Sequence, residues 1–262
     1  MRDLTDRGRP AAGEKAVVVK QQDHMRQIGT CMLCGRTDFV QYRAGIYGKD
    51  ICACTNCNLV FTNPRPEPDA LLGRYGADYY AHWISPEQRA RRIKLWARRV
   101  KIVKKVFPSG RLLDVGCGEG LFLDCARKAG YEVTGLEVSG FAVKYAKKEF
   151  GLNVHHASLE NADLPGNAFD IITLWHTLEH MPDPDIVLCK ARQLLKPGGC
   201  LIVAVPNVED IIGQGFYRMM RGHYFQIYMP DSKEPHLYHF STATLKRLLE
   251  KCGFKIAAMG AD

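Results

Sequence analysis

The sequence predicts an α/β fold with a mostly parallel sheet flanked by helices, preceded by a small unit organised by cysteines. The apolar run 112–115 leads into glycines at positions 116, 118 and 120 and then into a helical segment. From Arg111 onward, apolar runs alternate with helical segments, which is typical of a parallel sheet. Ahead of this region stand two C-x2-C pairs, the spacing of a zinc site.

Length and composition limit the class of protein. With 262 residues, the chain can form one α/β domain with its own core and a smaller unit. No apolar run approaches the roughly 20 residues that cross a bilayer, and we find no signal-peptide core. We therefore expect a soluble, cytoplasmic protein with no membrane partner. Ten cysteines without an export signal favour reduced thiols and metal over disulfides.

The N-terminal part divides into a tail and a zinc ribbon. Residues 1–28 are polar, without sustained periodicity, and are predicted to form a mobile tail. A ribbon is predicted for residues 29–64, where each C-x2-C pair presents two thiolates to half of a tetrahedron. The predicted ligands are Cys31, Cys34, Cys54 and Cys57. Cys52 could replace Cys54 only with poorer spacing. A structural zinc has all four positions filled by protein, so no catalysis is expected there.

Residues 65–108 are predicted to form a helical linker or lid. Nine Lys and Arg residues lie between Arg89 and Lys105, in a helix expected over roughly 86–107. Its apolar residues recur at three- and four-residue spacing, which places the basic residues on the opposite face. These apolar residues are Ile93, Trp96, Val100, Val103 and Phe107. A solvated face and a surface for an anionic partner both agree with this pattern, and the net charge of +8 allows either.

The main domain is predicted over 109–262. Strands are expected near 111–115, 132–137, 153–156, 169–175, 199–205 and 254–259, with helices between them. Ser241 is predicted to cap the last helix and Gly253 to end it, with Leu245, Leu248 and Leu249 on its buried side.

The glycine turn indicates a nucleotide-like cofactor. Its glycines permit a sharp turn close to a ligand, and the first N–H groups of the next helix point at that ligand. Glu137 ends the next apolar run about 20 residues later, where a carboxylate can accept both ribose hydroxyls. The spacing is G-x-G-x-G, and Leu121 stands where a dinucleotide fingerprint requires glycine.

This segment closely resembles motif I of the class I S-adenosylmethionine-dependent methyltransferases, which have a Rossmann-like sheet. The resemblance covers most of residues 109–260 and includes Glu137, the run 169–175 and the phrase 194–199. A zinc ribbon followed by a phrase very similar to residues 58–66 also occurs in some bacterial methyltransferases. The resemblance implies S-adenosylmethionine as cofactor. Such domains normally end with a seventh, antiparallel strand, so a chain stopping at Asp262 is expected to be truncated or one strand short.

The resemblance also implies a set of cofactor residues. Gly116 and Gly118 would line the methionine part, Asp114 would orient the loop, Glu137 would hold the ribose and Val138 would pack on adenine. The remaining implied contacts are Ser158 and Leu159 at the adenine edge, Trp175 and His176 at the methionine pocket, and Glu160 as a weaker candidate. Tyr79 and Tyr80 are either lid residues or packing aromatics.

The phrase His176-Thr177-Leu178-Glu179-His180 follows the fourth strand, where open α/β sheets bind ligands. It is similar to a phrase of the ubiquinone-type O-methyltransferases. Three interpretations remain open: His176 or His180 is the general base, the H-x-x-E-H spacing binds a divalent cation, or the group fixes the loop structurally.

Residues 206–240 form a long insertion rich in aromatics, and such insertions usually build the acceptor pocket. His236 and His239 lie in a phrase that resembles one in the same family. They are alternative bases or acceptor-site residues, or members of an aromatic packing group.

These patterns predict a methyltransferase that acts on a small acceptor, such as a sugar, a quinone-like phenol or a secondary metabolite, at a hydroxyl or a carbon. One alternative is an RNA-base methyltransferase that holds RNA with the ribbon and the basic helix. The other is a non-catalytic binding module that keeps the fold. The sequence does not indicate an oligomeric state.

Overall fold

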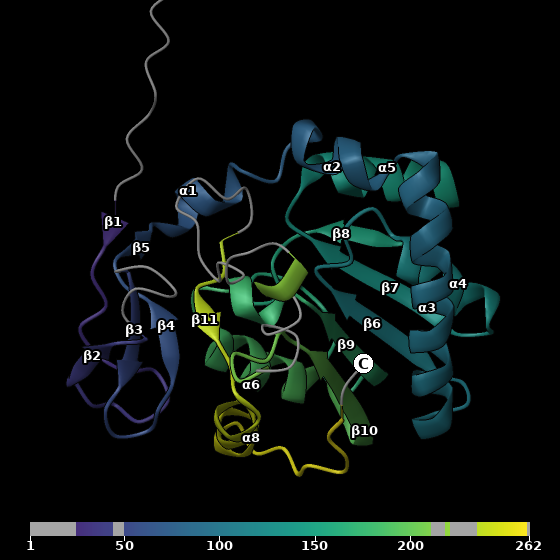
Figure 1. Cartoon of the computed structure of the whole chain (residues 1–262). Helices are drawn as coiled ribbons and strands as arrows, with labels where there is room; N and C mark the ends of the chain where they lie inside the picture. Colours follow the sequence, from purple (N-terminus) through teal and green to yellow (C-terminus); the bar gives the residue numbers. More distant parts are fainter. Residues whose placement is uncertain (1–24, 44–49, 211–217, 221–234, 261–262) are drawn as a thin grey trace, which may run out of the picture.

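The computed structural model describes residues 25–43, 50–210, 218–220 and 235–260. At its centre lies a parallel sheet of five strands in the order β10-β9-β6-β7-β8 (Figure 1). The strands are β6 (Arg111–Val115), β7 (Glu132–Glu137), β8 (Val154–His156), β9 (Phe169–Trp175) and β10 (Leu195–Ala204). The predicted α/β fold with a parallel sheet is confirmed. The last of these strands begins earlier than predicted, with an irregular register between Leu195 and Cys200.

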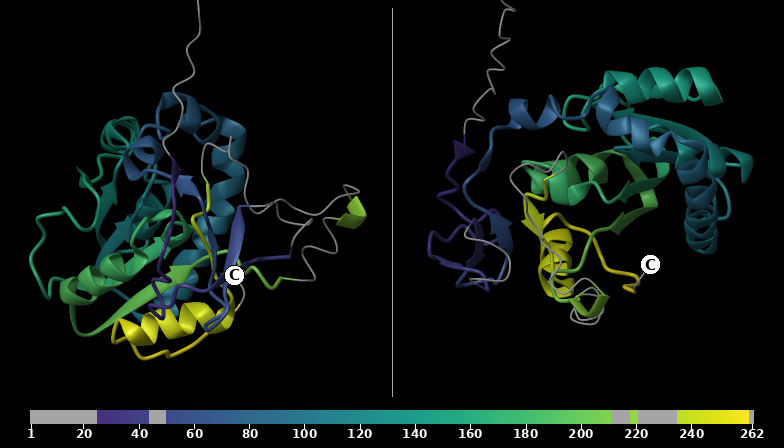
Figure 2. Two further views of the ribbon diagram at one scale, coloured as in Figure 1. Left: turned by 90° about the vertical axis from the view of Figure 1, so that its left-hand side faces the viewer. Right: turned by 45° about the horizontal axis from the view of Figure 1, so that its top comes forward.

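Helices cover both faces of the sheet. Side chains alternate along a strand, so Leu112 and Ile171 pack into one core cluster and Leu113 and Ile172 into another. The first face carries α3 (Pro86–Val106), α4 (Leu121–Lys128) and α5 (Gly140–Phe150). The second face carries α6 (Pro184–Leu194) and α8 (Thr242–Lys251). Figure 2 shows the two layers from other directions.

The basic helix α3 differs from its prediction at two positions. Val100 and Val103 are buried as expected, but Ile93 is 43% exposed and the basic residue Arg99 is only 4% exposed. The prediction was wrong at Arg99 because its guanidinium lies over the rings of two tryptophans, Trp96 and Trp175. It was also wrong at Ile93, whose side chain stays exposed. Among the described residues, no helix is both long enough and apolar enough to span a membrane.

The ribbon is joined to the main domain by a shared sheet. Its strands β2 (Phe39–Gln41), β3 (Ile51–Cys54) and β4 (Val60–Thr62) are antiparallel, and β11 (Tyr238–His239) from the insertion pairs with β4. Figure 1 shows β11 beside β4, next to the second helical layer. Leu59 and Phe61 pack in the same core cluster as Leu188 and Leu248. The ribbon therefore shares its core with the main domain.

Two short helices and a second ladder complete the connection. Residues 25–26, assigned above to the tail, form β1 (Met25–Arg26) and pair with β5 (Arg65–Pro66), while residues 1–24 lie outside the described part. The chain then passes through α1 (Pro68–Leu72) and α2 (Ala77–Trp83) to α3.

The last helix begins as predicted. The Ser241 hydroxyl accepts from the N–H of Thr244 in a capping box, and Leu248 is fully buried. The helix ends at the C-cap Cys252, and Gly253 follows with φ +83°. The strand predicted for 254–259 is absent from the described residues, so that prediction was wrong. These residues are mostly exposed and β10 is the edge of the described sheet, so they gain neither burial nor ladder hydrogen bonds.

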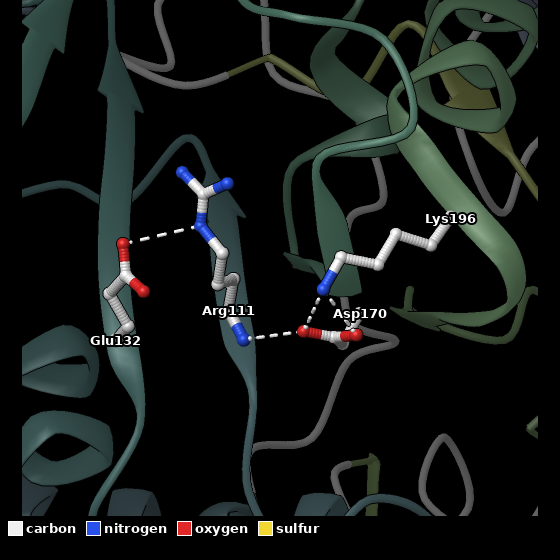
Figure 3. A network of polar contacts seen from close by, with 4 residues as sticks. All are labelled: Arg111, Glu132, Asp170 and Lys196. Carbon is white, nitrogen blue, oxygen red and sulfur yellow. Dashed lines mark hydrogen bonds and ion pairs between the residues drawn. The ribbon is translucent and has the colours of Figure 1, made fainter.

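A polar network connects the amino ends of four strands, β6, β7, β9 and β10 (Figure 3). The Asp170 carboxylate accepts from the backbone N–H of Arg111 at 2.8 Å and from Lys196 Nζ at 2.8 Å. Lys196 and this N–H lower the pKa of Asp170. The Arg111 side chain reaches Glu132 on β7 at 3.2 Å. Function is therefore expected at the opposite, carboxyl edge of the sheet.

Candidate functional site

The glycine turn follows β6 and lies against the loop after β9. Gly116 and Gly118 have φ values of +70° and +56°, the left-handed region that favours glycine. A Cβ on Gly116 would lie 2.4 Å from the Thr177 side chain. The two loops can approach this closely only because position 116 has no side chain.

Glu137 links this turn to the end of β7. Its carboxylate accepts from the N–H of Gly118 at 2.9 Å and from the N–H of Ser139 at 2.8 Å. The side chain is 5% exposed, and burial raises the pKa of Glu137 although these hydrogen bonds counteract the shift. Each carboxylate oxygen keeps a second lone pair, so Glu137 can still accept from a ribose hydroxyl.

Tyr80 of α2 covers this carboxylate. Its ring stacks on Phe141 with centroids 6.1 Å apart, and its hydroxyl is among the groups that counteract the rise in the pKa of Glu137. Tyr79 packs edge-on against Tyr80 at 4.8 Å. Because Tyr80 is only 5% exposed, it acts both as a packing residue and as a cover of the glycine turn.

Two buried ionisable residues, Asp114 and Arg99, lie near the turn. Asp114 is 3% exposed, accepts from the Thr173 hydroxyl at 2.6 Å, and burial raises its pKa to about 8. Arg99, whose charge opposes that shift, lies with its guanidinium 4.8 Å from the Trp96 ring and 4.7 Å from the Trp175 ring.

The sequence interpretation missed Arg99. The signal was present in the helical periodicity, because Arg99 is three residues after Trp96 and four before Val103 and therefore shares their face. A basic residue within an apolar stripe indicates a buried partner or ligand.

Arg99 engages His176, which begins the loop after β9. Its Nη2 lies 2.8 Å from His176 Nε2. Arginine can only donate, so Nε2 accepts and the neutral ring carries its proton on Nδ1. That Nδ1 is 3.7 Å from a Glu179 oxygen. His176 has φ +53°, a strained value for a residue with a side chain.

The residues predicted at the adenine end lie beyond β7 and β8. Val138 and Ser158 are half-buried, whereas Leu159 is fully buried in the core. Glu160 is half-buried. A hollow of about 360 Å³ opens nearby, lined by residues 153–157 and 162–164 and by Lys147, and no glycine-turn residue lines it. These contacts therefore stay predictions.

Glu179, His180 and His236 converge next to this loop, and we refer to them as the Glu179 cluster. Glu179 and His180 belong to the short helix η1 (Leu178–His180), and His236 precedes β11. The His180 and His236 rings are 4.7 Å apart, and His180 Nε2 is 3.9 Å from a Glu179 oxygen. Burial, with a smaller contribution from His180, lowers the pKa of His236 to about 4.

His239 contacts the ribbon through Thr62, and its ring lies 6.1 Å from the ring of His236. It is 4% exposed, its Nε2 lies 3.1 Å from the Thr62 hydroxyl, and burial lowers its pKa to about 3. That hydroxyl donates to the carbonyl of His236 at 2.8 Å. The structure thus brings His176 and His180 to Glu179 and gives His239 a place in the junction with the ribbon.

The four predicted zinc ligands come together. All four Sγ atoms lie within 4.8 Å of one another, with 3.5 Å between Cys31 and Cys57 and between Cys34 and Cys54. Cys52 instead points its thiol at the Asn63 carbonyl, 3.8 Å away. Thiolates around one zinc lie about 3.8 Å apart, so the cluster has the right size.

Most of the insertion lies outside the described residues. The aromatics predicted there to line an acceptor pocket and not described are Phe216, Tyr217, Tyr224, Phe225 and Tyr228. Tyr238 and Phe240 are buried. The Tyr238 hydroxyl and Arg65 both donate to the Pro182 carbonyl, each at 3.1 Å, which connects β11, the ribbon exit and the chain after η1.

The strand order, the glycine turn and Glu137 define the class: this is a class I S-adenosylmethionine-dependent methyltransferase fold. A family model described as a methyltransferase domain matches residues 86–258. This match covers more than half of the 262 residues, so the chain belongs to that methyltransferase family.

Named relatives agree with this assignment. The chain is 30% identical over 155 residues to the ubiquinone biosynthesis O-methyltransferase of Aromatoleum aromaticum, covering 57% of this chain and 65% of the relative. It is 36% identical over 107 residues to the enzyme of the same name from Haemophilus ducreyi, covering 37% and 45%. A methyltransferase structure from Thermotoga maritima matches with a TM-score of 0.53 at 24% identity, covering 71% of this chain and 80% of that one, which supports the fold.

Proposed function

We propose that this protein transfers a methyl group from S-adenosylmethionine to a hydroxyl oxygen of a small, quinone-like phenol. The observation that carries the proposal is the Glu179 cluster, which lies after β9 beside the glycine turn. The relatives named O-methyltransferases support oxygen as the methyl acceptor. The matched segments cover at most 65% of the length of these relatives, so the identity of the acceptor is part of our proposal.

The residues around the glycine turn fit the cofactor. A side chain at Gly116 would fill the cradle, and Glu137 with Tyr80 forms a polar wall where ribose hydroxyls would bind. Arg99 supplies a buried positive charge suited to the cofactor's carboxylate. Asp114, held by Thr173, would orient the turn. When bound, S-adenosylmethionine supplies an activated methyl group with a neutral leaving group.

The chain's other task is to manage the proton of the acceptor hydroxyl. The Nε2 atom of His176 is already hydrogen-bonded to Arg99, and the Nε2 atom of His239 is already hydrogen-bonded to Thr62. Of the three histidines predicted as catalytic, His180 is the one that directs its Nε2 toward the buried Glu179 carboxylate. We therefore place the loss of the acceptor proton at the Glu179–His180 pair.

The ribbon is proposed to hold a structural zinc. Four cysteine ligands complete a tetrahedron and leave no open position, so this metal would stabilise the fold without taking part in the reaction. Through β11 it would also fix the strand that follows His236.

The test is a product analysis with labelled S-adenosylmethionine. The full chain is offered catechol-type phenols, a sugar nucleotide and total RNA, and the methylated atom is identified by NMR or nuclease digestion. We expect an aryl methyl ether and little label in sugar or RNA. Label confined to RNA, or no transfer with cofactor bound, would refute the proposal.

A further inference from the structure

The Glu179 side chain is a buried carboxylate whose nearest polar neighbours, His176 and His180, lie beyond hydrogen-bond distance. It is 1% exposed, and neither of its oxygens has a hydrogen-bond partner within the described ranges. Burying a carboxylate without partners costs several kcal/mol, so native proteins pair such groups with a proton donor or a cation. The surroundings of Glu179 therefore indicate what it holds.

His180 presents a lone pair to this carboxylate. Its Nδ1 lies 3.0 Å from the carbonyl oxygen of Pro235, and a carbonyl can only accept, so Nδ1 carries the proton. In the neutral ring Nε2 then has the lone pair, 3.9 Å from Glu179 Oε1. Two acceptors face each other at this distance, an arrangement that a shared cation stabilises.

His236 completes a set of three donors. One ligand atom each from Glu179, His180 and His236 lies within 4.8 Å of the other two. Donors bound to one ion at about 2.1 Å lie about 3–4 Å apart, so small side-chain movements bring this set onto an ion. The backbone supports the arrangement, because the N–H of Leu237 donates to the carbonyl of Glu179 at 2.8 Å.

His176 has a different task in this arrangement. Arg99 occupies its Nε2, and its Nδ1–H faces the Glu179 carboxylate at 3.7 Å. Such a donor behind a ligating carboxylate orients it toward the metal. The H-x-x-E-H motif therefore separates into two ligands and one orienting residue, and the third ligand comes from a distant part of the chain.

We propose that Glu179, His180 and His236 bind a divalent transition-metal cation, separate from the zinc of the four cysteines. Two imidazoles and one carboxylate favour zinc, manganese, iron or cobalt over magnesium or calcium. Three protein ligands leave coordination positions open. Given the proposed function, an acceptor oxygen would occupy one of them and lose its proton more easily.

Metal counting on the full chain tests the binding. Chelator-treated protein is saturated with zinc, desalted, and analysed for metal and protein by atomic emission. We expect two zinc ions per wild-type chain and one in Glu179→Gln and His236→Ala. The matched control is His155→Ala, an exposed histidine outside the cluster, which is expected to keep two.

Cobalt distinguishes the two sites within one sample. The cobalt–thiolate charge-transfer absorption reports the ribbon alone and should be unchanged in Glu179→Gln, whereas the d–d bands of the second site should disappear. One metal per wild-type chain at saturation, or two in Glu179→Gln, would overturn the proposal. The count uses no methyl acceptor, so it stands or falls independently of the reaction proposed above.

Discussion

The cysteine cluster and the Glu179 cluster are similar in size but differ in how the chain assembles them. Four thiols come from two local turns, Cys31 with Cys34 and Cys54 with Cys57. In the Glu179 cluster, Glu179 and His180 are adjacent, whereas His236 comes from the segment before β11. Ligands on the same local turn have a fixed spacing in the sequence, so they can be predicted from it. Ligands brought together by the pairing of distant strands have no fixed spacing.

The two clusters also differ in the number of ligands they offer a metal ion. They are connected to each other through the backbone. Four cysteines fill a tetrahedron, whereas three ligands leave it open. Strand β11 pairs with β4 of the ribbon, and Leu237, just before it, bonds to Glu179. The ribbon thus holds the segment that carries the third ligand. The following predictions separate the contributions of the two regions.

The largest effect is expected for Cys54→Ser. Loss of one thiolate should remove the ribbon zinc, whose binding contributes on the order of 10 kcal/mol to folding of such units. We expect rapid proteolysis within β2–β4 and less than one-tenth of the ribbon zinc. Cys52→Ser, which changes a thiol outside the cluster, should behave as wild type; equal zinc loss in both variants would contradict the ligand assignment.

Glu179→Gln should affect activity and leave the ribbon intact. Removing the carboxylate should lower kcat by about 100-fold or more, because positioned proton transfer contributes about that much. The affinity for S-adenosylmethionine, measured by calorimetry, should change little. The control is Glu250→Gln, an exposed carboxylate on α8. An unchanged kcat in Glu179→Gln would remove the cluster from the reaction.

Asp114→Asn should change the pH dependence of stability. Asp114 is buried like Glu179 but has a partner in Thr173, and its folded pKa is about 8 against roughly 3.9 unfolded. A raised folded pKa gives stability that is full below pH 3.9 and is lost as pH rises through 8.

Wild type should therefore lose about 2–3 kcal/mol more than Asp114→Asn between pH 6 and pH 9, measured by urea unfolding. Asparagine keeps an oxygen that accepts from Thr173. Asp163→Asn, at an exposed acid, serves as control. Parallel pH profiles for wild type and Asp114→Asn would show that Asp114 is ionised in the folded protein.

Glu137→Ala should weaken cofactor binding. Loss of a charge-assisted hydrogen-bonded pair costs about 1.5–3 kcal/mol, or a 10- to 100-fold rise in Kd. Calorimetry with S-adenosylhomocysteine measures the change. Glu132→Ala alters the exposed carboxylate at the other end of β7 and should leave Kd unchanged. An unaltered Kd in Glu137→Ala would mean that the ribose binds elsewhere.

The smallest effect is expected for Thr62→Val, at the junction of the two regions. Valine removes the hydroxyl that donates to the His236 carbonyl and faces His239 Nε2, at a cost of about 1–2 kcal/mol. Chemical denaturation measures the loss. Thr55→Val removes an exposed hydroxyl that donates to Asp38 and provides the matched comparison. Equal losses in both variants would argue against a specific coupling.

Most of the sheet was predictable because burial on both faces produces continuous apolar runs. The strands 111–115, 132–137 and 169–175 match their predictions, and so does the cap at Ser241. The strand predicted for 254–259 failed because hydrophobicity alone does not show whether a neighbouring strand is present. Arg99 was missed because charged residues were assigned to the exposed face of α3, whereas this one is buried.

By itself, the sequence determined the family, the glycine turn with Glu137 and the four cysteines, because each depends on residues close together in the chain. Only the tertiary structure decided that β11 extends the ribbon sheet, that Arg99 engages His176, and that His236 joins Glu179. These contacts depend on strand pairing and on the burial of charges between distant segments. Neither leaves a fixed spacing in the sequence.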